Sequence, residues 1–226
     1  MSLAKPQVHL VKTRLVNSYV VEYSDKLLVV DVAAGCHRYV LGFITEQLNR
    51  QPADVKLVCC THDDPDHIGG VKALARLCDC DVAIPFASNS LWRKTLNDPT
   101  GAPIRFATSL REAFRPRAWQ MYANPKRGQR ARQQPYYAGA EQMSAVKKQR
   151  LKLKAGQQLP GFEDWQLVHT PGHSWDSCCY YHSASDSLIS GDCLLGSGKQ
   201  GQLVTPAIYS NPLQMRKTLA KLRALQ

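Results

Sequence analysis

The 226-residue sequence has no apolar run near the length of a membrane-spanning helix, and its first six residues carry no apolar stretch typical of a secretory signal. It also shows no internal repeat and no low-complexity tract. These absences exclude a membrane-spanning helix and a repeat architecture. With 44% hydrophobic and 21% charged residues, the composition is ordinary for a globular protein, and we expect one cytoplasmic domain over residues 1–226.

Spacings typical of a structural zinc site are missing too, although the chain has eight cysteines. One residue separates Cys78 from Cys80, whereas a zinc knuckle has two between its cysteines. The adjacent cysteines at 59–60 and at 178–179 lie in strand-like runs, where neighbouring side chains point to opposite faces and cannot easily form a disulfide. We therefore expect core thiols in a reducing compartment.

Acidic residues are scarce in one part of the chain. Residues 105–154 carry thirteen Lys or Arg against two acids, a balance of +11 that equals the net charge of the whole protein. The other residues carry sixteen bases and sixteen acids. We interpret residues 105–154 as a basic insertion within a neutral domain. Its local signals predict a helix that starts at a capping box, Ser109–Glu112, and ends or kinks at Pro116, and a second helical piece at Met143–Arg150.

The chain concentrates metal-ligating side chains between Thr61 and Gly70. Five of them fall within six consecutive positions: His62, Asp63, Asp64, Asp66 and His67. The apolar run at residues 55–60 predicts a buried strand before them, and the run at residues 71–77 predicts a helix after them. A solvated turn with an Asp cap is the simpler interpretation, but the paired glycines and the two histidines favour a metal site. Such a metal can lower the pKa of bound water to about 7, which would supply hydroxide at neutral pH.

Two later segments repeat this arrangement. Residues 165–170 are strand-like, and Pro171-Gly172 then turns the chain so that His173 stands at the strand end. A short apolar strand at residues 188–189 is likewise followed by a glycine turn and Asp192. We therefore expect three strand ends to deliver ligands to one pre-organised metal site at the edge of a sheet.

In this order the segments resemble the metallo-β-lactamase superfamily. Its signature is His-x-His-x-Asp-His, a distant His in Thr-Pro-Gly-His, an Asp in Ser-Gly-Asp and a final His. The matching residues are His62, Asp66, His67, His173 and Asp192. The resemblance extends to the early strands at residues 15–21 and 28–31. It implies an α/β fold, an αββα sandwich of two mixed sheets with outer helices, to which residues 105–154 would add a basic helical lid.

The resemblance also implies the ligand sets. His62, residue 64 and His173 would hold a first metal, Asp66, His67 and the final histidine a second, and Asp192 would bridge the two. The chain departs from this set twice, because Asp64 replaces a histidine and no histidine follows Asp192. A helix predicted from Asn211 onward ends the sequence, where the family continues to its last histidine. A shortened chain and a lost ligand fit this sequence equally.

Asp64 changes the expected charge of the site. Two divalent ions, two carboxylates and a hydroxide sum to +1, and the carboxylate of Asp64 brings the sum to zero, so electrophilicity should fall. An oxygen-richer site also shifts metal preference from zinc towards manganese, iron or magnesium. We expect one or two zinc ions, with manganese or iron as alternatives. Asp64 facing outward would instead leave a two-histidine site.

The insertion lies between the two histidine segments, so it should fold over the site as a lid. Its aromatics are Trp119, Tyr122, Tyr136 and Tyr137. They fit packing on the core, but so one-sided a charge also attracts anions: nucleic acid, an anionic membrane surface or a small anionic substrate. The predicted substrate-binding residues are Lys126, Arg127, Arg130 and Arg132.

These features predict a metal-dependent hydrolase that acts on an ester, thioester, lactone or lactam of a small anionic molecule. Metal-bound hydroxide would attack, and Asp66 or Asp192 would orient it. A phosphodiesterase or nuclease is the alternative, since Asp64 also resembles the hydrolase domains of bacterial competence proteins for DNA uptake. A non-catalytic binding protein on a decayed scaffold is the third. The sequence identifies no general acid and no oligomeric state.

Overall fold

The computed structural model describes residues 5–86, 91–116, 125–140, 150–196 and 202–225. Its larger sheet has six strands in sequence order, β1 (Gln7–Lys12), β2 (Asn17–Glu22), β3 (Leu27–Val30), β4 (Val55–Cys59), β5 (Asp81–Pro85) and β6 (Arg150–Leu153). The first three pair antiparallel and the last four pair parallel, so the sheet is mixed.

A second sheet has the order β10 (Ser187–Ile189), β9 (Cys178–His182), β8 (Phe162–His169) and β7 (Gln158–Leu159). Its pairings between described residues are all antiparallel. A short antiparallel pair, β11 (Leu195–Gly196) and β12 (Leu203–Val204), forms a separate sheet. The helices are α1 (His37–Gly42), α2 (Pro65–Ile68), α3 (Val71–Cys78), α4 (Leu91–Asn97), α5 (Gly101–Ala113), α7 (Pro125–Arg132) and α8 (Pro212–Arg223).

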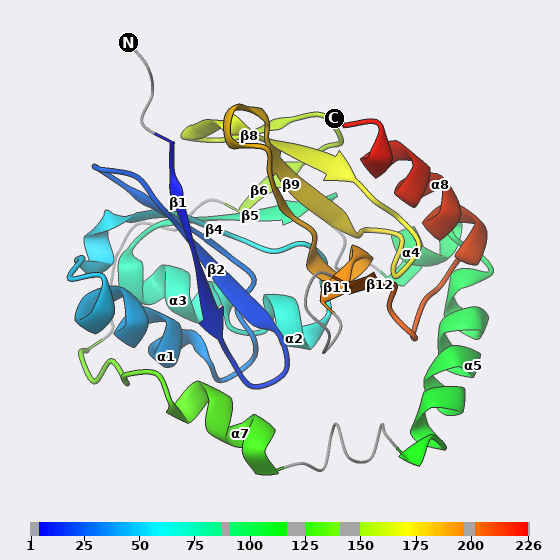
Figure 1. The fold of residues 1–226 in the computed structure, drawn as a ribbon, viewed down its shortest axis with the longest axis horizontal. Helices are drawn as coiled ribbons and strands as arrows, with labels where there is room; N and C mark the ends of the chain where they lie inside the picture. The colour runs from blue at the N-terminus through cyan, green and yellow to red at the C-terminus, as the bar shows by residue number, and fades with distance from the viewer. Residues whose placement is uncertain (1–4, 87–90, 117–124, 141–149, 197–201, 226) are drawn as a thin grey trace.

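Two cores hold these layers together because side chains alternate along each strand. On β3, Leu27 and Val29 join a cluster with α1 and α3, whereas Leu28 and Val30 face the other sheet and pack with Phe162 and Trp165. Figure 1 shows α1 and α3 on one face of the six-stranded sheet and β8 and β9 on the other. Each fully buried side chain of this kind contributes about 1.5–3 kcal/mol. The predicted αββα sandwich is confirmed.

α8 runs beside the smaller sheet. It begins as predicted, with the Asn211 side chain accepting a hydrogen bond from the backbone N–H of Gln214 at 3.0 Å. Thr218 donates to the carbonyl of Pro171 at 2.8 Å, and Lys221 donates to the carbonyl of His169 at 2.7 Å. These contacts fix the turn that carries His173. In the part of the chain that the structure describes, no helix is long and apolar enough to cross a membrane.

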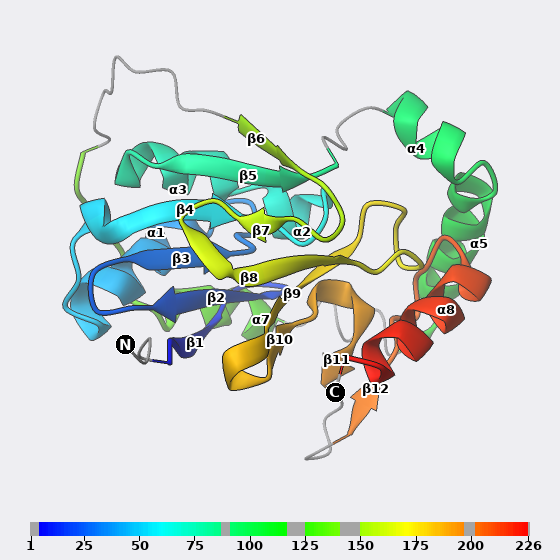
Figure 2. The ribbon, with the colours of Figure 1, turned by 90° about the horizontal axis from the view of Figure 1, so that it is seen from above.

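The basic segment differs from its prediction in two places. α5 starts at Gly101, so Ser109 is in the interior of a helix and the predicted capping box is wrong. Arg150 opens strand β6 rather than closing a helix, because it pairs with Val82 of β5. The rest of the predicted helical piece lies outside the described residues. Figures 1 and 2 place α7 beside α1 and away from α5, so the described parts of the segment reach opposite sides of the domain.

Candidate metal centre

Strand ends bring the predicted ligands to one edge of the domain. β4 ends at Cys59, shortly before Thr61 and His62, and α2 then presents His67. Gly191, which follows β10, has a positive φ of 51°, and a Cβ there would lie 2.5 Å from Thr61 Oγ1. Only glycine fits this turn without strain. The turn sets Asp192 against the residues that follow β4.

The structure brings five of the predicted ligands into two groups that share His62. One group is His62, Asp64 and His173, and the other is His62, His67 and Asp192. Asp64 Oδ2 lies 3.3 Å from Nε2 of His62 and 3.3 Å from Nε2 of His173. The two oxygens of Asp192 face different histidines, with Oδ1 3.2 Å from His67 Nε2 and Oδ2 3.6 Å from His173 Nε2. Asp192 therefore links the two groups.

These separations fit a divalent metal. In tetrahedral zinc sites with bonds of about 2.0–2.1 Å, neighbouring ligand atoms lie about 3.3 Å apart. Among the described residues, Nε2 of His62 and Nε2 of His67 are buried and make no well-aligned hydrogen bond, although carboxylate oxygens lie 3.3 Å and 3.2 Å away. An unsatisfied buried polar atom costs about 1–3 kcal/mol, and a metal ion would satisfy both nitrogens.

The other nitrogen of each histidine has a partner that fixes the ring. Nδ1 of His67 lies 2.9 Å from Asp31 Oδ2, and Nδ1 of His173 lies 2.8 Å from the carbonyl of Ile208. Nδ1 of His62 lies 3.1 Å from Thr61 Oγ1, and Thr61 donates to Asp31. Such partners hold Nε2 towards the centre and are typical of metal sites. The sequence offered one indication that Asp31 lies near the site, because this residue directly follows β3, the strand that pairs parallel with β4.

The groups around His67 and Asp64 shift the pKa values of these two side chains. Burial lowers the pKa of His67, but the charges of Asp31 and Asp192 outweigh it and raise this pKa well above its ordinary value. Burial opposes ionisation of Asp64, yet its contacts with His173 and His62 and the charge of Arg105 hold its pKa well below the usual range. The surrounding groups therefore favour the ionised form of both side chains.

Arg105 of α5 also contacts the ligands. Its Nη2 donates to Asp64 Oδ2 and lies 3.5 Å from His173 Nε2, and its Nη1 lies 3.4 Å from the carbonyl of His173. Sequence patterns gave no sign of this contact because it joins residues 41 positions apart. The inner face of α5 is further fixed by Thr108, which donates to the carbonyl of Tyr209 at 3.1 Å. The start of the basic segment thus contacts the ligands through Arg105.

Other predicted site residues lie elsewhere. Asp66 is half-buried in the first turn of α2 and belongs to neither ligand group, so its role stays a prediction. Arg130 and Arg132 are exposed on α7, and the side chains of Lys126 and Arg127 lie outside the described part.

The aromatic residues of the segment divide in the same way. Tyr137 packs on the core, and Tyr136 contacts Tyr39 with ring centroids 5.2 Å apart. Trp119 and Tyr122 lie outside the described residues. Packing on the core is therefore the favoured interpretation for Tyr137, whereas Tyr136 stays 58% exposed.

A pocket of about 230 Å³ opens beside the first ligand group. Its walls include Asp64, Thr95, Asp98, Arg105, Trp175 and Ser210. Because Asp64 and Arg105 belong both to this pocket and to the ligand region, a molecule held there would lie next to the metal. The volume suits a small group rather than a duplex.

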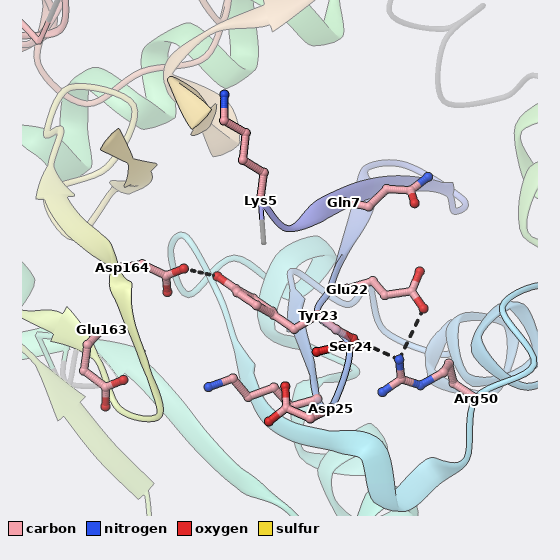
Figure 3. Close-up of a pocket in the computed structure, with 10 residues that line it drawn as sticks. Lys5, Gln7, Glu22, Tyr23, Ser24, Asp25, Arg50, Glu163 and Asp164 are labelled. Atoms are coloured by element: carbon pink, nitrogen blue, oxygen red, sulfur yellow. Dashed lines mark hydrogen bonds and ion pairs between the residues drawn. The ribbon is translucent and has the colours of Figure 1, made fainter. Parts of the chain in front are cut away.

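A second hollow lies at the opposite edge of the larger sheet, around the turn between β2 and β3 (Figure 3). Arg50 donates there to Asp54 at 2.9 Å, to Glu22 at 3.3 Å and to the carbonyl of Tyr23 at 2.9 Å. Tyr23 donates to Asp164, which also contacts Nε2 of His182 at 3.0 Å. These charged groups thus satisfy one another.

Two proteins of known activity match short stretches of the chain. It is 35% identical over 81 residues to the exodeoxyribonuclease WalJ of Streptococcus pneumoniae serotype 2. This stretch covers 36% of this chain and 28% of that protein. It is 40% identical over 77 residues to a hydroxyacylglutathione hydrolase of Hydrogenovibrio crunogenus, which covers 32% and 25%. The matched stretches thus span little more than a quarter of these relatives.

Comparison of whole folds and families reaches further. A solved metallo-beta-lactamase family protein of Thermus thermophilus matches with a TM-score of 0.55 and 20% identity, covering 96% of this chain and 70% of that one. The family model of the metallo-beta-lactamase superfamily matches residues 11–225. These findings confirm the resemblance inferred from the ligand segments. The chain belongs to the metallo-beta-lactamase superfamily.

Proposed function

We propose that this chain hydrolyses an ester-like bond, such as an ester, thioester, lactone or lactam, in a small anionic molecule. The observation that carries the proposal is the small pocket whose wall shares Asp64 and Arg105 with the ligand region. It can hold the acyl or leaving group of a small substrate beside the metal, next to the paired charges of Asp64 and Arg105. Similarity to a hydroxyacylglutathione hydrolase over 77 residues supports the same class.

Each side chain has a role in this scheme. His62, Asp64, His67, His173 and Asp192 would hold one or two zinc ions, with manganese or iron as alternatives. When bound, the metal would activate water at neutral pH and polarise the oxygen under attack. Asp192 lies between the two groups, so it can accept a hydrogen bond from the attacking water and orient it. Asp31, Thr61 and the carbonyl of Ile208 keep the histidine rings in place.

The test compares substrate classes on one metal-loaded preparation. We expect turnover of a carboxylate-bearing thioester or lactone and loss of at least a hundredfold in kcat/KM in Asp192→Asn, which keeps the size of the side chain. Arg76→Gln removes a charge from the exposed face of α3 and serves as the control with wild-type turnover. Absence of turnover on all four bond types, with metal bound, would contradict the proposal.

A nuclease is the second candidate, favoured by the 35% identity to WalJ over 81 residues and by the exposed arginines of α7. If α7 grips a polyanion, affinity for single-stranded DNA should fall steeply with salt, with a log-log slope of about 0.7 per phosphate contact. Replacing Lys126, Arg127, Arg130 and Arg132 by Gln should then remove most of that slope while metal binding stays intact. Metal-dependent cleavage of DNA without turnover of any small ester would favour the nuclease over our first choice.

A further inference from the structure

Arg105 stands where the chain departs from the family's ligand set. The family signature has a neutral histidine at position 64, and this chain has a carboxylate there. The guanidinium of Arg105 reaches that carboxylate from α5, with Nη2 donating to Asp64 Oδ2. The side chain of Arg105 is 28% exposed and that of Asp64 is 20% exposed, so the pair is partly shielded from water. Their interaction is therefore stronger than that of a surface ion pair.

The charges of the two residues cancel. A carboxylate at position 64 lowers the net charge of the metal site by one relative to a neutral histidine. The guanidinium of Arg105 raises it by one again. An Asp64–Arg105 pair therefore carries the same net charge as one neutral histidine.

We propose that Arg105 is a positioning residue that offsets the charge of Asp64, so that the pair takes the electrostatic place of the family's histidine. The carboxylate oxygen remains within ligand distance of His62 and His173, while the guanidinium restores the positive charge that polarises a substrate. The inference rests on the metal site of the proposed function. It does not depend on which substrate that site uses.

Metal titration of four proteins tests the pairing without any substrate. Each metal-free protein is titrated with Zn²⁺ against a competing chelator: wild type, Asp64→His, Arg105→Gln and the double variant. Even with water-like screening, a unit charge a few ångströms from a divalent ion changes its affinity about tenfold.

Arg105→Gln and Asp64→His each leave one charge of the pair without its partner. We expect one of them to bind Zn²⁺ more tightly, and the other more weakly, than the wild type and the double variant. Arg105→Gln, which leaves Asp64 unpaired, should bind about tenfold tighter than wild type. Asp64→His, which leaves Arg105 beside the cation, should bind about tenfold weaker than the double variant. The double variant should lie between these extremes, near wild type.

Two further proteins separate charge from structure. Arg105→Lys keeps the positive charge and should stay within about threefold of wild type. Arg115→Gln removes a charge from an arginine just beyond the end of α5 that pairs with Glu112, and should leave Zn²⁺ affinity unchanged. Thermal unfolding of the metal-free proteins shows which variants fold.

The proposal is overturned if Arg105→Gln binds Zn²⁺ no tighter than wild type, or if Asp64→His binds equally well with and without Arg105. It is also overturned if Arg105→Lys behaves like Arg105→Gln, because the role would then be geometric. The expected order of affinities without turnover of any ester would refute only the proposed function. Ester turnover without that order would refute only the role of Arg105.

Discussion

The two edges of the six-stranded sheet, at opposite ends of its strands, differ in how far their polar side chains are hydrogen-bonded. At the hollow around the β2–β3 turn (Figure 3), Arg50 has three acceptors and Tyr23 shares Asp164 with His182. At the other edge, where β3 and β4 end, buried nitrogens of His62 and His67 make no well-aligned hydrogen bond among the described residues, although carboxylate oxygens lie 3.3 Å and 3.2 Å away. The first arrangement is complete in itself, whereas the second becomes complete only with a bound cation.

This difference indicates that one edge serves metal binding and the other serves the stability of the fold. Buried polar groups are almost always hydrogen-bonded, so an arrangement that leaves two imidazole nitrogens unsatisfied is kept at a cost in folding energy. Changes at the ligand edge should therefore act mainly on metal affinity. Changes at the opposite edge should act mainly on the free energy of unfolding.

The largest effect is expected from His62→Ala, because His62 is the only described residue shared by both ligand groups. Zn²⁺ affinity should fall at least a hundredfold, measured by competition with a chelator. The free energy of unfolding of the metal-free protein should fall far less than the Zn²⁺ affinity does, because the substitution also removes a buried nitrogen that makes no hydrogen bond. His169→Ala is the control, because His169 ends β8 but belongs to neither group. Equal affinity loss in both variants would break the comparison.

A smaller effect should follow from Asp31→Asn. Asp31 contacts His67 Nδ1 and accepts from Thr61, so it orients His67 without reaching the centre. Its φ is 61°, a left-handed conformation that Asn tolerates, so this substitution adds little backbone strain. Loss of such a partner typically weakens metal binding about 10- to 100-fold. Wild-type affinity in Asp31→Asn would show that His67 needs no orienting carboxylate.

The sequence allowed most of this edge to be foreseen, because ligands that follow strands are local signals. An apolar run that the structure shows as a strand or short helix precedes or adjoins each of the ligands His62, His67, His173 and Asp192. The contribution of Arg105 could not be foreseen, since a pairing across 41 positions depends on where α5 packs. The capping box at Ser109 was misplaced for a related reason, because the helix propagates from Gly101 through a sequence that also fits a helix start.

The smallest effect on Zn²⁺ affinity is expected at the opposite edge, where Arg50→Gln removes a guanidinium that has three hydrogen-bond acceptors. Hydrogen bonds to charged groups contribute about 1.5–3 kcal/mol, and Glu22 keeps a second partner in His9 at 2.8 Å, so we expect a loss of about 1–2 kcal/mol in the free energy of unfolding. Denaturant unfolding of the metal-free protein measures this loss. Zn²⁺ affinity should stay within twofold of wild type. Arg130→Gln, on the exposed face of α7, should change stability by no more than about 0.5 kcal/mol. A variant at Arg50 that unfolds normally but binds Zn²⁺ more weakly would show that the two edges are coupled through the parallel strands between them.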